Sequence, residues 1–136
     1  MIKDLLIPEV ERRFGHLNPS INTEENPIVR IQPIQDAIGD LVICDDGDEA
    51  TVYIEKITHS HFGNFDYDLS EEEKEKEIAE SVIEFMDDLF ADRVLLHTSP
   101  NNRIGGWKLI EDDQESLAMK ADHVYYLWSK PYEPKM

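Results

Sequence analysis

The stretch that decides the fold is SEEEKEKEIAESVIEFMDDLFAD, residues 70–92. Ser70 followed three residues later by Glu73 has the form of a capping box, in which the hydroxyl and the carboxylate each satisfy a backbone N–H at the start of a helix. Further on, apolar side chains recur at i, i+4 and i+7, the spacing of a helix with one buried face. They are Ile78, Ala79, Val82, Ile83, Phe85, Met86, Leu89 and Phe90. The sequence therefore predicts one long amphipathic helix that begins at Ser70.

Residues 70–92 also carry much of the charge of the chain. They hold ten acidic and two basic side chains, a net charge of −8 out of −17 for the whole sequence. Such a negative field repels nucleic acid and anionic membranes and speeds encounter with basic proteins or cations. Acids in the first turn suit the helix dipole, but Asp87, Asp88 and Asp92 oppose it at the other end. We expect no nucleic-acid or membrane partner, and an electrostatically poor last turn.

The segments on either side of this helix read as strands. A short helix is predicted first, over residues 3–14, where apolar side chains have helical spacing and Gly15 follows. Alternating or continuous apolar runs rich in β-branched residues then indicate strands. These strands are predicted at residues 28–34, 41–44, 51–62, 94–97, 104–110 and 123–129. Asp46 and Gly47, between two of these runs, favour a hairpin turn.

This order of elements predicts an α+β fold. We expect a single-layer, mainly antiparallel sheet of about five or six strands, with the long acidic helix packed across it and the short N-terminal helix beside it. The chain has 136 residues, of which 40% are hydrophobic, so one core suffices and residues 1–136 form a single domain.

Composition also points to a cellular compartment. The single cysteine, Cys44, cannot form an internal disulfide, and the chain has no pair of cysteines with zinc-binding spacing. Residues 1–13 do not contain the apolar core of a signal peptide. No apolar run approaches the ~18 residues of a membrane span. The sequence predicts a cytoplasmic protein.

A His-x-His pair is the best local candidate for chemistry. In a strand, His59 and His61 point to the same face and could offer two imidazoles to one metal ion. Asp66, His97 and His123 are the candidates for further ligands of a divalent transition metal, which would activate a bound water in a metal-dependent enzyme. The alternative is that these are ordinary surface or hydrogen-bonded histidines, because a site of this kind needs at least three protein ligands.

A second candidate is a ligand loop around Arg103 and Trp107. A cation and an aromatic beside turn-forming residues could hold a small anion or a peptide end. The alternative is an ordinary strand connection, with Trp107 in the core. The nucleophile elbow, the phosphate loop and the dinucleotide glycine pattern are all missing from the sequence, so nucleophilic catalysis has little support.

The acidic helix itself leaves two interpretations open. A run of charge is usually a solvated face that keeps a protein soluble. The sharper hypothesis is a docking surface for a basic protein, with the contact centred on Glu73, Glu77, Glu80 and Glu84. We therefore expect a small non-catalytic interaction protein without a cofactor, of the inhibitor or immunity type. The alternative function is the metal-dependent enzyme built on the His-x-His pair.

Overall fold

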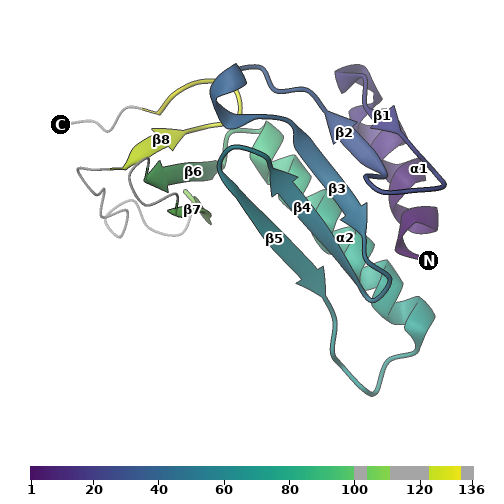
Figure 1. Ribbon diagram of the computed structural model, residues 1–136. Coiled ribbons are helices and arrows are strands. Elements are labelled where there is room, and N and C mark those ends of the chain that lie inside the picture. Colours follow the sequence, from purple (N-terminus) through teal and green to yellow (C-terminus); the bar gives the residue numbers. More distant parts are fainter. Residues whose placement is uncertain (100–103, 111–122, 133–136) are drawn as a thin grey trace.

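The computed structural model describes residues 1–99, 104–110 and 123–132, and its elements are shown in Figure 1. The helices are α1 (Ile2–Phe14) and α2 (Glu71–Phe90), with short 3-10 turns at Gly15–Leu17 and Asp36–Ile38. The strands are β1 (Ser20–Ile21), β2 (Val29–Ile31), β3 (Leu41–Asp45), β4 (Glu49–Ile54), β5 (Thr58–Gly63), β6 (Val94–Ser99), β7 (Ile104–Leu109) and β8 (Val124–Tyr126). The predicted α+β class, the long helix and the short N-terminal helix are confirmed.

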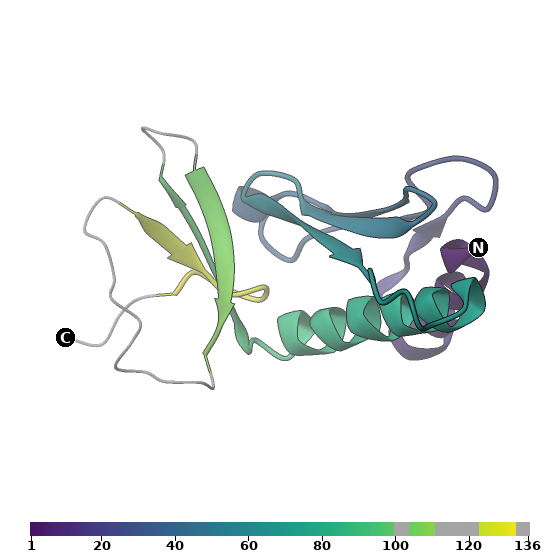
Figure 2. The same cartoon turned by 90° about the horizontal axis from the view of Figure 1, so that it is seen from below.

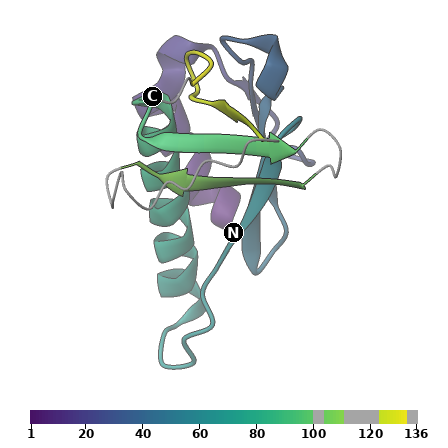
Figure 3. The ribbon, with the colours of Figure 1, turned by 90° about the vertical axis from the view of Figure 1, so that its left-hand side faces the viewer.

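The strands are divided between two antiparallel sheets, where the sequence predicted one. The first has the order β1-β2-β3-β4-β5, and the second has the order β7-β6-β8. Figure 3 shows the smaller sheet lying across one end of α2 and of the larger sheet. The prediction of a single sheet was wrong because β6 pairs on both sides, with β7 and with β8, and does not extend the first sheet. Residues 51–62, predicted as one strand, form two strands of the first sheet, β4 and β5, around a turn in which the Ile57 N–H donates to the Ile54 carbonyl over 2.8 Å.

Both helices lie on one side of the five-stranded sheet. Figure 2 shows α2 running under the strands, with α1 beside it. Their apolar faces meet the sheet in one continuous cluster, where Val82, Met86 and Leu89 are fully buried. At the far end the rings of Phe14 and Phe90 meet edge to face with their centres 5.0 Å apart. The amphipathic stripe predicted from the sequence is thus the face that α2 buries.

The acids near the end of α2 have specific partners. Asp87 accepts a hydrogen bond from Arg13 Nη1 of α1 over 2.8 Å. Asp88 pairs with Arg93, whose Nε and Nη2 lie 2.9 and 2.8 Å from Oδ1. Two of the three carboxylates that oppose the helix dipole, Asp87 and Asp88, therefore have a guanidinium beside them. These pairs compensate for the poor last turn that the sequence predicts.

Asp92 has a different role, at the turn that leaves α2. Its φ of 59° is left-handed, a conformation in which Asp is tolerated better than most residues. Its Oδ1 accepts from the backbone N–H of Ser129 over 3.0 Å, and its Oδ2 accepts from the Ser129 hydroxyl. Asp92 thereby ties the end of α2 to the segment that follows β8, next to the buried Trp128.

The opposite face of the five-stranded sheet is not covered by either helix, as Figure 2 shows. In β4 and β5 the side chains of this open face alternate with core side chains. The pairs that share it are Tyr53 with His59 and Thr51 with His61. His59 and His61 are both exposed, as the strand period predicts.

Candidate functional site

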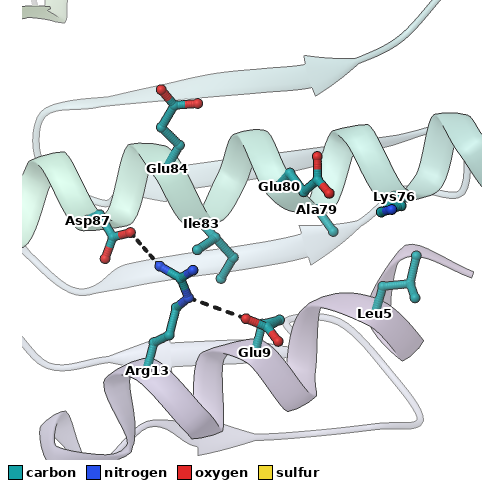
Figure 4. A pocket seen from close by; sticks show the side chains of 9 residues that line it. All are labelled: Leu5, Glu9, Arg13, Lys76, Ala79, Glu80, Ile83, Glu84 and Asp87. Atoms are coloured by element: carbon teal, nitrogen blue, oxygen red, sulfur yellow. Dashed lines mark hydrogen bonds and ion pairs between the residues drawn. The ribbon is translucent and has the colours of Figure 1, made fainter.

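A groove runs between α1 and α2 on the side of the helices away from the sheet, and Figure 4 shows its side chains. Its volume is about 530 Å³. It is lined by Leu5, Glu9 and Arg13 from α1 and by Lys76, Ala79, Glu80, Ile83, Glu84 and Asp87 from α2. We call these nine residues the helix groove. Three other hollows on the described parts of the chain have smaller volumes, of about 190, 150 and 200 Å³.

The helix groove combines an apolar floor with acidic walls. Leu5, Ala79 and Ile83 form the apolar part, and Leu5 remains 42% exposed although it is a large hydrophobic residue. Four carboxylates and two cationic side chains complete the lining. A surface of this kind matches a segment that carries apolar side chains on one face and basic side chains on its flanks.

The charges of the helix groove divide into two sets. Arg13 bridges the helices, with Nε 3.3 Å from Glu9 Oε2 and Nη1 2.8 Å from Asp87 Oδ2. Hydrogen bonding from Arg12, with a smaller contribution from Arg13, lowers the pKa of Glu9, so that carboxylate stays ionised. Figure 4 shows the bridge at one end of the groove.

The second set consists of Glu80 and Glu84. Both are exposed, and none of the ion pairs formed within residues 1–99, 104–110 and 123–132 includes either of them. No cation of the described residues lies within ion-pair distance of either carboxylate, although Lys76 lines the same groove. The structure leaves these two carboxylates at the groove as charges that a basic partner could neutralise.

All four acids predicted for partner binding are exposed on α2. Glu73, Glu77, Glu80 and Glu84 follow one another at i, i+4, i+7 and i+11, so they share one side of the helix. At the N-terminal end, Ser70 Oγ accepts from the Glu73 N–H over 3.2 Å, which confirms the part of the Ser70 hydroxyl in the predicted capping box. Glu77 accepts a hydrogen bond from Asn64 Nδ2 in the preceding loop.

The two histidines of the His-x-His pair lie together on the open face of the sheet. Their ring centres are 5.1 Å apart in an edge-to-face arrangement. His61 Nδ1 lies 3.1 Å from Thr51 Oγ1 and 3.2 Å from Glu49 Oε1. The Thr51 hydroxyl donates to an Asp46 oxygen over 2.6 Å, so its oxygen accepts from His61 and the proton of neutral His61 is assigned to Nδ1. Nε2 is then the lone-pair nitrogen of His61.

The other predicted metal ligands do not join this pair. Asp66 lies in the loop after β5, where its Oδ1 accepts from the Asp68 N–H over 3.0 Å. His97 and His123 belong to the three-stranded sheet and its approach, with ring centres 5.7 Å apart. Within the described ranges there is no group of three or more His, Cys, Asp or Glu side chains placed to hold a metal ion. The structure thus brings the candidates together as two separate histidine pairs.

The predicted ligand loop is only partly visible. Arg103 lies outside the described residues. Trp107 lies in β7, with its ring centre 4.7 Å from that of Phe85, and its Nε1 donates to Ser60 Oγ over 2.5 Å. Trp107 therefore packs against the core and joins the two sheets, which supports its interpretation as part of an ordinary strand.

Two features of this surface were missed by the sequence reasoning. The first is the contribution of α1 to the helix groove through Leu5, Glu9 and Arg13, which carries no local signal. The second is a pair of exposed aromatics, Phe65 and Tyr67, in the loop before α2. Their alternation with aspartates in the stretch NFDYD was the available signal.

Comparison with known proteins gives no relative. No protein-family model, no curated protein and no solved structure matches this chain. No helix in the described part of the chain has both the length and the apolar character needed to cross a membrane. The case for a function therefore depends on the surfaces described above.

Proposed function

We propose that this is a non-catalytic interaction protein, of the inhibitor or immunity type, that binds a basic protein through the acidic side of α2. The observation that carries the proposal is the pair Glu80 and Glu84, which are exposed, form no ion pair with the described residues, and lie beside the apolar floor of the helix groove. A merely solvated charged face would not need an apolar floor next to its charges.

The groove suits a basic amphipathic helix or a similar segment of the partner. Apolar side chains of that segment would contact Leu5 and the exposed edges of Ala79 and Ile83, and Leu5 offers most of the apolar area because the other two are only 5% and 6% exposed. Its lysines or arginines would face Glu80 and Glu84, which sets the register and speeds association. The Arg13 bridge holds α1 and α2 at a fixed spacing, so the groove exists before the partner arrives.

The cytoplasm is the proposed location. Cys44 is a free, half-buried thiol. Burial, with a further contribution from Asp46, raises its pKa, so it is predominantly the less reactive neutral thiol. An unoxidised single cysteine fits a reducing compartment.

The metal-dependent enzyme is the less favoured function. Its motivation remains the His59 and His61 pair, and among the described residues no group of three or more potential ligands is placed to hold a metal ion. It stays a prediction that elemental analysis of the untagged protein can test, with a melting curve before and after a chelator.

The proposed function can be tested with a synthetic helical peptide that carries leucines on one face and lysines on the other. The variant Glu80→Lys/Glu84→Lys should bind it at least about tenfold more weakly than the wild type, because attraction at the groove becomes repulsion. Affinity should also fall steeply between about 50 mM and about 500 mM salt, as charge screening shortens the reach of the carboxylates. Both quantities are measured by isothermal titration calorimetry.

The matched control is Glu24→Lys/Glu25→Lys, which makes the same change in net charge at two exposed acids away from the groove. Its affinity should stay close to that of the wild type. Equal losses in the two variants would mean that only the net charge matters, and the groove would lose its role. Salt-insensitive binding, or no binding by the wild type, would overturn the proposed function.

A further inference from the structure

The loop between β5 and α2 presents two aromatic side chains to solvent. Phe65 is 74% exposed and Tyr67 is 94% exposed, the highest values among the large hydrophobic residues of the described chain. Single exposed hydrophobics are normal on a protein surface, but two rings within three residues form a local patch. Aromatic side chains are also among those that most often dominate binding energy at protein interfaces.

The loop holds these rings in a defined shape. The Asp66 N–H donates to Asn64 Oδ1 over 2.9 Å, and the Leu69 N–H donates to the Asp66 carbonyl over 3.2 Å. Asn64 is itself fixed by its hydrogen bond to Glu77 of α2. A loop with this internal support has less conformational freedom to lose on binding.

A hollow of about 200 Å³ lies between this loop, the β3–β4 turn and the first turns of α2. Both aromatic side chains line it, together with the carboxylates of Asp48 and Glu71. Aromatic faces next to carboxylates are the surroundings in which a guanidinium is stabilised, by stacking on the rings and by paired hydrogen bonds. The hollow is therefore suited to a cationic side chain.

The chain itself shows this preference. Lys74 Nζ lies 5.7 Å from the centre of the Tyr67 ring and 3.9 Å from Glu71 Oε1. An intramolecular cation thus already uses one aromatic and one carboxylate of the hollow. The large exposed fraction of Tyr67 leaves room for a second cation from outside.

We propose that this hollow receives an arginine side chain of the basic partner, stacked on Phe65 and Tyr67 and paired with Asp48 or Glu71. This inference rests on the proposed function and adds the position of a specific anchor to it. The hollow lies at the N-terminal end of α2, on the side of the helix that carries Glu71, Lys74 and Ile78, whereas the helix groove uses the side that carries Lys76, Glu80 and Ile83. The anchor is therefore a contact separate from the helix groove.

The test uses a peptide that contains several arginines among glycines and serines, and a twin in which every arginine is replaced by citrulline. Citrulline keeps the shape of the side chain but has no charge. The dissociation constants are measured by titrations followed with ¹⁵N–¹H correlation spectra. The variant Phe65→Ala/Tyr67→Ala should bind the arginine peptide about tenfold more weakly than the wild type, and the citrulline twin should bind at least as weakly.

The control is Ile34→Ala, which removes a 65% exposed side chain elsewhere and should leave the affinity unchanged. Melting curves of both variants confirm that they are folded. The anchor is overturned if the aromatic variant binds as well as the wild type, or if citrulline binds as well as arginine. If either result overturns the anchor but Glu80→Lys/Glu84→Lys still weakens binding of the leucine–lysine helix, the proposed function survives. If the wild type binds neither peptide, both proposals fall.

Discussion

Substitution of Asp92 tests how the end of α2 is fixed to the C-terminal segment. We consider three variants, Asp92→Ala, Asp92→Gly and Asp92→Asn. The aspartate contributes two hydrogen bonds to Ser129 and occupies a left-handed backbone position with φ 59°. Each variant removes a different part of this arrangement, so their order of stability is diagnostic.

The magnitudes follow from the geometry. Loss of the hydrogen bonds to a half-exposed carboxylate costs about 2 kcal/mol. Alanine also lacks the tolerance of Asp for the left-handed region, which adds about 1 kcal/mol, whereas glycine adopts that region without strain. Asparagine keeps the shape and the left-handed tolerance but loses the charge, at a cost of about 1 kcal/mol. We expect free energies of unfolding lowered by about 3, 2 and 1 kcal/mol for Ala, Gly and Asn, respectively.

The assay is urea unfolding at neutral pH, followed by the fluorescence of the two tryptophans. A double-mutant cycle with Ser129→Ala isolates the contact, because Asp92→Asn should cost little once the hydroxyl is absent. An Asp92→Ala variant within about 0.5 kcal/mol of the wild type would refute the reasoning. So would a glycine variant that is less stable than the alanine variant.

Two further predictions concern packing and a thiol. A Cβ at Gly105 would lie 1.6 Å from the Ile57 carbonyl oxygen, so Gly105→Ala should lower the free energy of unfolding by about 2 kcal/mol or more. Gly15→Ala is the control and should not lower it, because the space around the new carbon is open. Urea titrations that give the two variants equal stability would contradict this prediction. The pKa of Cys44 is raised above its ordinary 9.0, so iodoacetamide should alkylate it more slowly in the folded than in the urea-unfolded protein. The folded state disfavours the thiolate, so the Cys44 thiol makes a contribution to folding stability that depends on pH. This contribution is fully present below pH 9.0 and is lost as the pH rises through the higher pKa of the folded state. Equal alkylation rates in the two states would count against a protected thiol.

The elements that the sequence predicted well are those with local signals. Helix α2 has both a cap at Ser70 and a clear apolar period, and it begins where expected. The turn between β4 and β5 was missed because its support is remote in sequence. The Glu55 N–H donates to the Asp40 carbonyl and the Lys56 N–H to the Ile38 carbonyl, over 3.1 and 3.0 Å. The sequence of residues 51–62 alone does not predict these hydrogen bonds to Ile38 and Asp40.

The candidate site shows the same division. The sequence predicted Glu80 and Glu84 as contact residues of the acidic helix, and strand spacing was enough to pair His59 with His61. The helix groove depends on the packing of α1 against α2, so Leu5 could not be assigned to it from its neighbours in sequence. Which side chains meet across elements is decided by tertiary packing, which a single sequence does not encode locally.

The most direct test of the central claim is to locate the basic ligand on the protein. The ¹⁵N-labelled protein is titrated with the leucine–lysine helix at low salt, and the amide shifts are mapped residue by residue. We predict that the largest shifts lie along α1 and α2 beside the helix groove, around Glu80, Ile83 and Glu84, and that they disappear at high salt. Shifts concentrated on the three-stranded sheet, or no shifts at low salt, would contradict the account.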